Sequence, residues 1–380
     1  MSISLAEIFR QAIANGSVRT HAQGWKVVND VLNCRTESLG GHLYKCSDCQ
    51  VKIPVYNSCR NRHCPKCQGQ ASAKWLEARK DELLSAPYFH LVFTVPHELN
   101  GLFLQNKELL FNILFRASAK TLKDVAKRRL GGSLGFFSVL HSWGKKMEFH
   151  PHVHTVVPGV ILKQDGKIKL SADNYLLPKN VLSPVFRAIF IKSLVRAFRQ
   201  GKLILLGELE KFRQPSVFFS LIKTIKTKHW ICYAKKPFAG PDAVLKYLAL
   251  YTHRVAISEK RLVALKNGSV TFTYKDYADK CKTKPLTLSV TEFTRRFLLH
   301  VLPKRFVRIR YSGFLSSANR ATLLLKLKES FQIFDSVELK PFKPRTCPLC
   351  NCEHLELIEK LPRAKHSSSS HKTKILPLVA

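Results

Sequence analysis

Three histidines alternate with other residues along one segment of the chain. His150, His152 and His154 occupy every second position in the stretch HPHVHTVV, whose β-branched residues favour a strand. Side chains two apart on a strand project from the same face of a sheet. Two imidazoles at this spacing can bind one divalent cation and leave coordination positions open for water and phosphate oxygens. The pattern predicts a metal site on a sheet face, with hydrogen-bonded structural histidines as the alternative.

Two tyrosines are placed for chemistry in the stretch 242–253, which has helical periodicity. Tyr247 and Tyr251 are four residues apart, so both hydroxyl groups project from one face of a helix. Packing in the core is the alternative, but Val244 and Leu248 already provide an apolar stripe. A phenol has a pKa of about 10 and attacks only when its proton is withdrawn or its target is polarised. A cation on the histidine strand could polarise that target.

The cysteines are clustered in a way that predicts metal binding. The chain has 11 cysteines, and the pairs Cys46-x2-Cys49 and Cys64-x2-Cys67 have the spacing of two zinc knuckles. In a reducing compartment such pairs bind metal more often than they form disulfides. We therefore expect Cys46, Cys49, Cys64 and Cys67 to hold one structural zinc ion. The segment is poor in aliphatic residues and needs a metal to fold.

Further residues of ligand type lie around these knuckles and near the end of the sequence. A second zinc site interleaved with the first would use Cys34, His42, Cys59 and His63. The two histidines could instead be surface groups or contact phosphates. A third metal would be bound by Cys347, Cys350, Cys352 and His354.

The chain is strongly basic. It has 63 Lys and Arg against 26 Asp and Glu, a net charge of +37, and this excess favours an anionic partner, above all nucleic acid. No apolar run approaches the roughly 18 residues of a membrane span, and the first residues lack the layout of a signal peptide. We expect a cytoplasmic protein without a membrane partner. The candidates for contacts with a nucleic acid backbone are Arg60, Arg62, Lys66, Lys246, Arg254, Arg308 and Arg310.

The remaining pattern indicates which elements position these residues. Strands are expected at 88–95, 137–143, 149–157 and 230–234, and helices at 4–16, 70–85 and 184–200. Asp165-Gly166 and Asn267-Gly268 each predict a hairpin turn. Strands and helices alternate with hairpins, which favours an α+β fold with an antiparallel sheet and helices on one face.

Five motifs in this order resemble a known family. FTVP (Phe93 to Pro96), HPHVH and YLALYTHRVAIS follow in the order of the three motifs of HUH endonucleases. The zinc segment CRTESLGGH to NSCRNRHCPKCQ and the later LPKRFVRIRYSGFL resemble rolling-circle transposases of the insertion-sequence-ninety-one type. The resemblance extends roughly from Cys34 to Leu315.

This resemblance implies an HUH-like antiparallel sheet flanked by helices and preceded by a small zinc-binding domain. It implies that His152 and His154 bind Mg²⁺ or Mn²⁺ and that Tyr247 and Tyr251 are the nucleophiles. The third metal ligand is open: His150 lies on the right face, and Glu148, His141 and His90 are the alternatives.

The activity implied is nicking and rejoining of single-stranded DNA ends through 5′-phosphotyrosine bonds, in a bacterial protein associated with the nucleoid. A replication initiator or relaxase would share this chemistry, and a non-enzymatic zinc-dependent nucleic-acid-binding protein is a different alternative. The domain boundaries expected are a helix and zinc-binding, DNA-binding domain at 1–85, a catalytic domain at 86–315, and a basic C-terminal region at 316–380 with a cysteine cluster and a disordered tail.

Overall fold

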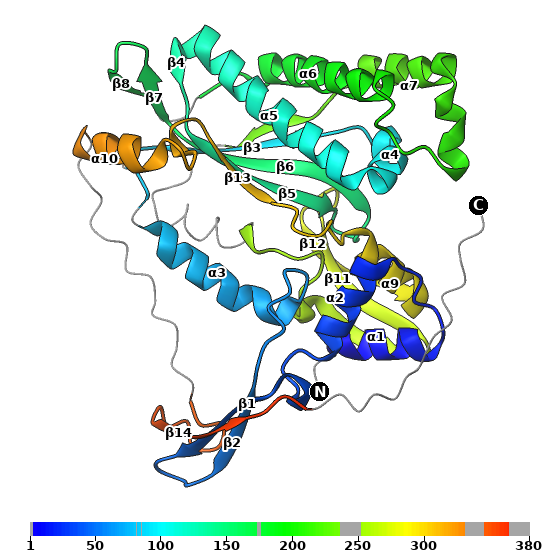
Figure 1. Cartoon of the computed structure of the whole chain (residues 1–380), viewed down its shortest axis with the longest axis vertical. Coiled ribbons are helices and arrows are strands. Elements are labelled where there is room, and N and C mark those ends of the chain that lie inside the picture. Colours follow the sequence, from blue (N-terminus) through cyan, green and yellow to red (C-terminus); the bar gives the residue numbers. More distant parts are fainter. Residues whose placement is uncertain are drawn as a thin grey trace. The chain divides into compact units, whose positions relative to one another are not determined.

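The computed structural model describes residues 3–80, 82–84, 86–172, 176–235, 252–330 and 346–364 (Figure 1). Their contacts divide the chain into two compact units. Unit 1 contains the described residues of 1–73, 257–301 and 339–380, and unit 2 those of 74–256 and 302–338. Within the described residues, no helix is long and apolar enough to cross a bilayer.

The helices of unit 1 follow local sequence signals closely. Ser4 and Glu7 form a capping box at the start of the helix predicted at 4–16, and each side chain accepts a hydrogen bond from the backbone of the other. The helix that follows buries Phe9, whose ring packs edge-on against Phe297 with centroids 5.4 Å apart. The helices are α1 (Leu5–Ala14), α2 (Ala22–Leu32) and α9 (Val290–Leu299), with short 3-10 turns at Glu37–Leu39 and Glu259–Arg261.

Unit 1 has two three-stranded antiparallel sheets. One has the order β10-β11-β12 (Leu262–Lys266, Ser269–Asp276 and Lys282–Ser289). Its first turn is the predicted Asn267-Gly268 hairpin, with φ of 48° and 70° at these two residues. The other has the order β14-β1-β2 (Leu355–Leu361, Gly41–Cys46 and Lys52–Tyr56). A strand from the end of the chain therefore pairs with one from its beginning.

Unit 2 is built on a five-stranded sheet of order β13-β5-β6-β3-β9, antiparallel at every pairing. Its strands are β3 (Tyr88–Thr94), β5 (Phe136–Trp143), β6 (Phe149–Pro158), β9 (Cys232–Lys235) and β13 (Ile309–Ser312). A smaller sheet has the order β4-β7-β8 (Gly132–Ser133, Val160–Lys163 and Ile168–Leu170), and it contains the predicted Asp165-Gly166 hairpin. The α+β class predicted from the sequence is confirmed.

Helices cover one face of the large sheet, as Figure 1 shows for α5 and α6. Phe93 of β3 contacts Phe186 of α6, with ring centroids 5.1 Å apart. The helices of unit 2 are α4 (Asn100–Gln105), α5 (Lys107–Leu130), α6 (Lys179–Arg199), α7 (Pro215–Thr227) and α10 (Arg320–Ser330), with 3-10 turns at His97–Leu99, Gly207–Arg213 and Gly313–Leu315. Gly313 has a φ of +64°, and a Cβ there would collide with the carbonyl oxygen of Leu134.

The opposite face of the sheet is covered as well. The helix α3 (Pro65–Lys80) begins in unit 1, and its second half contributes Trp75 and Leu76 to a cluster with Phe137 and Val156. The prediction that helices cover only one face of this sheet was therefore incomplete. The helix also begins earlier than the predicted 70, because Pro65 is accepted in a first turn.

The units differ from the three consecutive ranges predicted. Residues 257–301, expected in the catalytic range 86–315, pack in unit 1, and so do the described residues of 346–364. Whether the ranges 1–85, 86–315 and 316–380 each fold alone stays a prediction.

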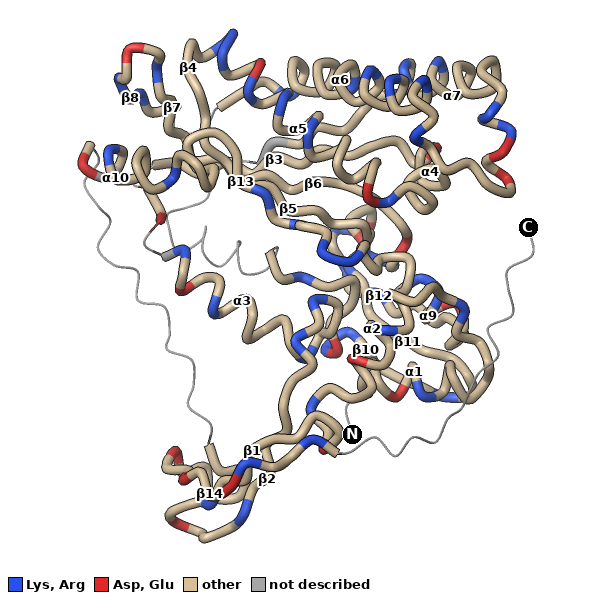
Figure 2. The backbone as a smooth tube through the Cα atoms, viewed as in Figure 1, with Lys and Arg blue, Asp and Glu red and all other residues tan. Residues whose placement is uncertain are grey.

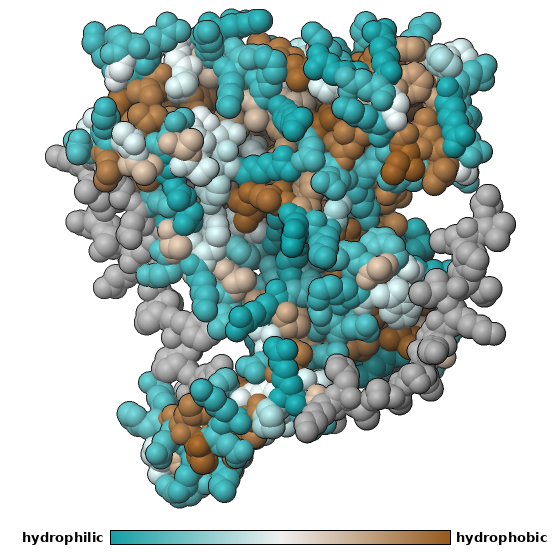
Figure 3. All heavy atoms as spheres, viewed as in Figure 1, coloured by the Kyte–Doolittle hydropathy of each residue, from teal (hydrophilic) through white to brown (hydrophobic). Residues whose placement is uncertain are grey.

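The surface reflects the composition of the chain. Lys and Arg outnumber Asp and Glu over the whole chain, and Figure 2 shows where both lie along the described backbone. Apolar side chains are visible over the β14-β1-β2 sheet (Figure 3), where Leu349, Leu357 and Ile358 are 72%, 46% and 46% exposed. This small sheet has little interior of its own.

Candidate functional site

Three histidines meet on the face of the large sheet that is opposite to α5 and α6. His141 of β5 lies directly across from His152 of β6 in the antiparallel register, and His154 follows two residues later on the same face. The Nε2 atoms of His152 and His154 are 3.0 Å apart. One ring nitrogen from each of the three residues lies within 4.8 Å of the others. This arrangement has the donor set and the spacing of a site for one divalent cation.

The third member of the group is His141, where the sequence analysis placed His150 first. His150 contributes its carbonyl oxygen, which accepts a hydrogen bond of 2.7 Å from Nδ1 of His152. Glu148 accepts a hydrogen bond from the backbone of Lys146 and is exposed. Neither belongs to the group found among the described residues. Spacing along one strand favoured His150. The group within 4.8 Å instead includes a ring nitrogen of His141, on the neighbouring strand.

Hydrogen bonds to the far sides of the rings fix their orientation. Because Nδ1 of His152 donates to a carbonyl, its Nε2 keeps a lone pair for a metal. Nδ1 of His154 lies 2.9 Å from Nε2 of the buried His90. Burial lowers the pKa of His152 to about 4 and holds the pKa of His154 well below 6.5. Both rings are therefore neutral at pH 7, which is the form that binds metals.

The residues 252–254, at the end of the predicted tyrosine helix, are fixed beside this cluster. Arg308 is 8% exposed and donates to the carbonyl oxygens of Thr252 and Arg254 at 2.9 and 3.2 Å. The charge of Arg254 also contributes to the low pKa of His152 and His154, after the larger effect of burial. A cation thus lies near the metal-type site. Tyr247, Tyr251 and Lys246 lie outside the described residues.

Two of the basic residues expected to contact DNA have partners within unit 2, and their contacts with DNA stay a prediction. Arg308 supports the segment at 252–254, as described above. Arg310 donates to Oδ1 of Asn112 at 2.5 Å, and its guanidinium lies 4.2 Å from the ring centroid of Phe115. The structure therefore assigns both side chains to the fold of unit 2. The sequence could not reveal this role, because an arginine beside apolar residues gives the same pattern whether it packs within the fold or contacts DNA.

The basic residues of the zinc loop are placed differently. Arg60 and Arg254 are exposed, whereas Arg62 is partly buried and burial lowers its pKa. The carbonyl oxygen of Lys66 accepts a hydrogen bond from Arg35 at 3.1 Å. Contacts of Arg60, Arg62, Lys66 and Arg254 with DNA stay a prediction.

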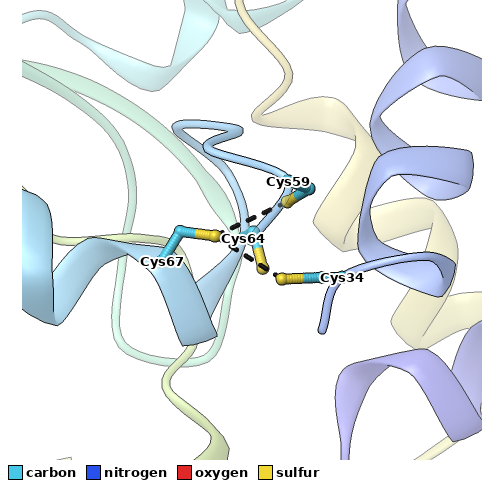
Figure 4. A group of neighbouring side chains, drawn as sticks. All are labelled: Cys34, Cys59, Cys64 and Cys67. Atoms are coloured by element: carbon cyan, nitrogen blue, oxygen red, sulfur yellow. Dashed lines mark hydrogen bonds between the residues drawn. The ribbon is translucent and has the colours of Figure 1, made fainter. Parts of the chain in front are cut away.

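The cysteines form two groups of four, but they are divided differently from the prediction. In the first group, Cys34 follows α2, Cys59 follows β2, and Cys64 and Cys67 lie at the start of α3 (Figure 4). The sulfurs of Cys34 and Cys59 are each 3.5 Å from that of Cys67. Figure 4 shows all four side chains turned toward one centre, as a tetrahedral four-thiolate zinc site requires.

In the second group, Cys46 and Cys49 meet Cys347 and Cys350. The expectation that Cys46 and Cys49 share one zinc with Cys64 and Cys67 was therefore wrong. The paired spacing identified the knuckles, but it could not show which knuckles meet.

Four other residues considered as ligands lie outside both groups. His42 lies on β1 with its ring 6.4 Å from that of Tyr44. The backbone of His63 donates to Asn61, and the sulfur of Cys352 accepts from the backbone of His354. The sequence suggested up to three metal sites built from cysteine and histidine. The described part of the chain contains two groups of four cysteines, and neither includes a histidine.

Comparison with known proteins agrees with both parts of this picture. Residues 5–95 match a family described as "Transposase zinc-binding domain", and residues 135–322 match one described as "Putative transposase". The first range contains one complete cysteine group, and the second contains His141, His152 and His154.

Two curated proteins match most of the chain. "Putative transposase y4qJ" of Sinorhizobium fredii is 45% identical over 307 residues, which cover 80% of this chain and 77% of that protein. "Transposase for insertion sequence element IS801" of Pseudomonas savastanoi pv. phaseolicola is 30% identical over 311 residues, covering 81% and 74%. The chain belongs to the family of transposases of this insertion-sequence type, IS91 and IS801, with a transposase zinc-binding domain at its N-terminus.

Proposed function

We propose that the protein is a metal-dependent tyrosine nickase and strand transferase of the HUH type, which acts on single-stranded ends of its element during rolling-circle transposition. The observation that carries this proposal is the group of His141, His152 and His154 on one sheet face, next to the segment that follows Tyr251 in the chain. Three imidazoles with ring nitrogens this close together suit metal-dependent catalysis better than binding of nucleic acid alone.

The residues present fit a divalent cation. Nε2 of His152 and of His154 and one nitrogen of His141 would hold Mg²⁺ or Mn²⁺, and imidazole donors favour Mn²⁺ of the two. When bound, the cation would withdraw charge from the scissile phosphate. The chain itself orients the rings through His90 and the carbonyl of His150, and Arg254 adds a positive charge for the phosphate.

Tyr247 and Tyr251 supply the nucleophiles in this proposal. The phenolic oxygen forms a bond to phosphorus, the bond from phosphorus to the 3′ oxygen breaks, and a 5′-phosphotyrosine and a free 3′-hydroxyl result. One ester replaces another, so a later 3′-hydroxyl can reverse the step without ATP. Arg308 holds the carbonyl of Thr252, the residue directly after Tyr251, which restrains the end of the segment that carries the nucleophiles.

The high positive charge supports binding of DNA strands in the bacterial cytoplasm, associated with the nucleoid. The attacking tyrosine must reach the scissile phosphate in line with the leaving 3′ oxygen. Single-stranded DNA is the substrate that suits this geometry. Arg60, Arg62, Lys66, Lys246 and Arg254 remain the proposed contacts with the backbone.

The test is the formation of a covalent adduct between the protein and a labelled single-stranded oligonucleotide of the element's ends, with Mn²⁺. We expect an adduct that survives denaturing gel electrophoresis. The double variant Tyr247→Phe, Tyr251→Phe should bind the oligonucleotide without forming it, and the single variants should show which tyrosine attacks. Tyr274→Phe, in β11, is the matched control and should behave like the wild type.

The outcomes separate the alternatives. Binding without any adduct in the wild type would favour the non-enzymatic nucleic-acid-binding protein and refute catalysis. An adduct that persists in the double variant would refute the nucleophile assignment. A replication initiator or relaxase shares the adduct, so the ends that are cut, those of a mobile element or of a replication origin, distinguish it from a transposase.

A further inference from the structure

We propose that the chain binds a second structural Zn²⁺ at a site divided between its two ends, through the thiolates of Cys46, Cys49, Cys347 and Cys350. This inference is independent of the cleavage chemistry. The family matches cover residues 5–95 and 135–322, so Cys347 and Cys350 lie beyond both. The second zinc would join the C-terminal strand to the N-terminal zinc-binding domain.

The distances between the sulfurs suit one metal ion. The sulfur of Cys46 lies 3.5 Å from that of Cys350, and the sulfur of Cys49 lies 3.6 Å from that of Cys347. A tetrahedral site with zinc–sulfur bonds of about 2.3 Å has sulfur–sulfur edges of about 3.8 Å. A disulfide needs about 2.05 Å, so these sulfurs are spaced for a shared ion.

The two cysteine pairs have the same backbone conformation. The carbonyl of Cys46 accepts from the amide of Gln50 at 3.1 Å, and the carbonyl of Cys347 accepts from Asn351 at 2.9 Å. Each acceptor is followed four residues later by a residue in the left-handed region, with φ of 58° at Gln50 and 60° at Asn351. Two copies of one turn, about 300 positions apart in the chain, therefore face each other as the two knuckles of a four-thiolate site.

Backbone amides are directed at the first sulfur of each pair. The amide of Cys49 donates to the sulfur of Cys46, and the amide of Cys350 donates to the sulfur of Cys347. Such contacts suit a thiolate, which is the form that binds zinc.

The surrounding sheet would be stabilised by a bound metal. β14 pairs with β1 from Cys46–Leu355 to Gly41–Leu361, but five consecutive residues of β14 are exposed. Its apolar side chains Leu357 and Ile358 are about half exposed, so burial contributes little to the stability of this strand. A three-stranded sheet without a core is marginal in water, and a bound metal is the usual remedy.

The experiment is a count of zinc per chain in the full-length protein, by elemental analysis and by native mass spectrometry. We expect two zinc ions in the wild type and one in the double variant Cys347→Ser, Cys350→Ser. Cys352→Ser is the matched control, because this neighbouring cysteine lies outside the group, and it should retain two. One zinc in the wild type, or two in the double variant, would overturn the proposal.

A measurement on the wild type covers the case in which the double variant does not fold. Titration with a mercurial reagent, followed with a zinc indicator, should release two zinc ions as the eight thiolates of the two groups react, in addition to the three cysteines outside both groups. Release of a single ion after four thiolates would refute the second site. Since this count needs no DNA cleavage, its failure is distinguishable from a failure of the proposed function.

Discussion

The ring of His154 contacts two other imidazoles through its two nitrogens, one toward the metal-type site and one toward His90. Its buried position and the proximity of His141 keep it neutral, since a proton there would be stabilised neither by water nor by a carboxylate. At the scale of single residues, His152 and His154 are therefore neutral imidazoles held in fixed orientations. Each donor has a separable role that substitution can test.

The first prediction distinguishes the two candidates for the third ligand. His141→Ala should slow Mn²⁺-dependent cleavage by about 10²- to 10³-fold, because it removes a nitrogen of the group. His150→Ala should stay within about threefold of the wild type, because His150 acts through its backbone carbonyl. Single-turnover cleavage of an end oligonucleotide measures both. Equal losses would refute the assignment of His141.

The second prediction concerns His90, a positioning residue. His90→Ala should raise the Mn²⁺ concentration needed for half-maximal cleavage by about 10- to 100-fold, with a smaller change in the rate at saturating Mn²⁺. His90→Gln retains a hydrogen-bonding group and should recover part of the affinity. An equal loss of rate at saturation in both variants, with unchanged half-saturation, would contradict this role.

The metal pair could be predicted from the sequence, and its third partner could not. A period of two along one strand reveals which residues share a face, so it marked His150, His152 and His154 alike, and the resemblance to HUH endonucleases implied His152 and His154 as the metal pair. The residue opposite them depends on the pairing of β5 with β6, which places His141 across from His152 and shifts register beside it. Register between strands is set by the packing of whole faces and not by any local pattern.

At the scale of elements, the segment 252–256 connects the tyrosines to the rest of unit 2. Thr252 is fully buried, and the ring of His253 lies 6.1 Å from that of Trp75 in α3. Arg308, just before β13, supplies the two hydrogen bonds that hold this segment. The motif FVRIRYSGFL thus contributes to the site by fixing backbone, which the sequence alone did not indicate.

The third prediction tests this anchor. Arg308→Met keeps an apolar stem but loses both hydrogen bonds to backbone carbonyls, each of the charged kind that contributes about 1.5–3 kcal/mol. We expect cleavage to slow at least 10-fold while the Mn²⁺ dependence stays unchanged. Arg305→Met, an exposed arginine of the same segment, should have no comparable effect. An equal fall in the cleavage rate of both variants would mean that the positive charge, and not the two hydrogen bonds, supports cleavage. Thermal unfolding checks that each variant is folded.

Most elements of this fold were accessible from local signals. The capping box of Ser4 and Glu7, the Asp165-Gly166 turn and the Asn267-Gly268 turn each specify their conformation within a few residues. The helix α6 begins at Lys179, earlier than the predicted 184, and Pro184 lies inside it. Because proline is best tolerated in a first turn, the local signal placed the start of this helix too late. The assignment of the Asn267-Gly268 hairpin to unit 1 depends on long-range packing, and so no local signal predicted it.

At the scale of the molecule, the net charge of +37 is divided between residues that serve the fold and residues exposed to a partner. Arg308 and Arg310 are engaged inside unit 2, whereas Arg254 and Arg60 are exposed. Charge counted from the sequence therefore overstates the part available to DNA. It also cannot tell which arginine belongs to which class.

The fourth prediction measures that division. The logarithm of the association constant for single-stranded DNA should fall linearly with the logarithm of salt concentration, by about 0.7 for each phosphate neutralised. Arg254→Gln should make the slope shallower by about that amount. Arg310→Gln should leave the slope unchanged, because its guanidinium is already held by Asn112 and Phe115. Fluorescence anisotropy at several salt concentrations tests both, and an unchanged slope for Arg254→Gln would exclude its contact with phosphate.

The pairing of β1 with β14 has a consequence for the order in which the protein is made. Cys46 and Cys49 are synthesised before any strand of unit 2, and Cys347 and Cys350 only after α10. On the ribosome, the first cysteine group can form as soon as Cys67 has emerged. Cys46 and Cys49 can complete the second group only after Cys347 and Cys350 have been synthesised. The N-terminal sheet gains its third strand last, so a chain truncated after the five-stranded sheet would lack β14, Cys347 and Cys350 in its zinc-binding domain.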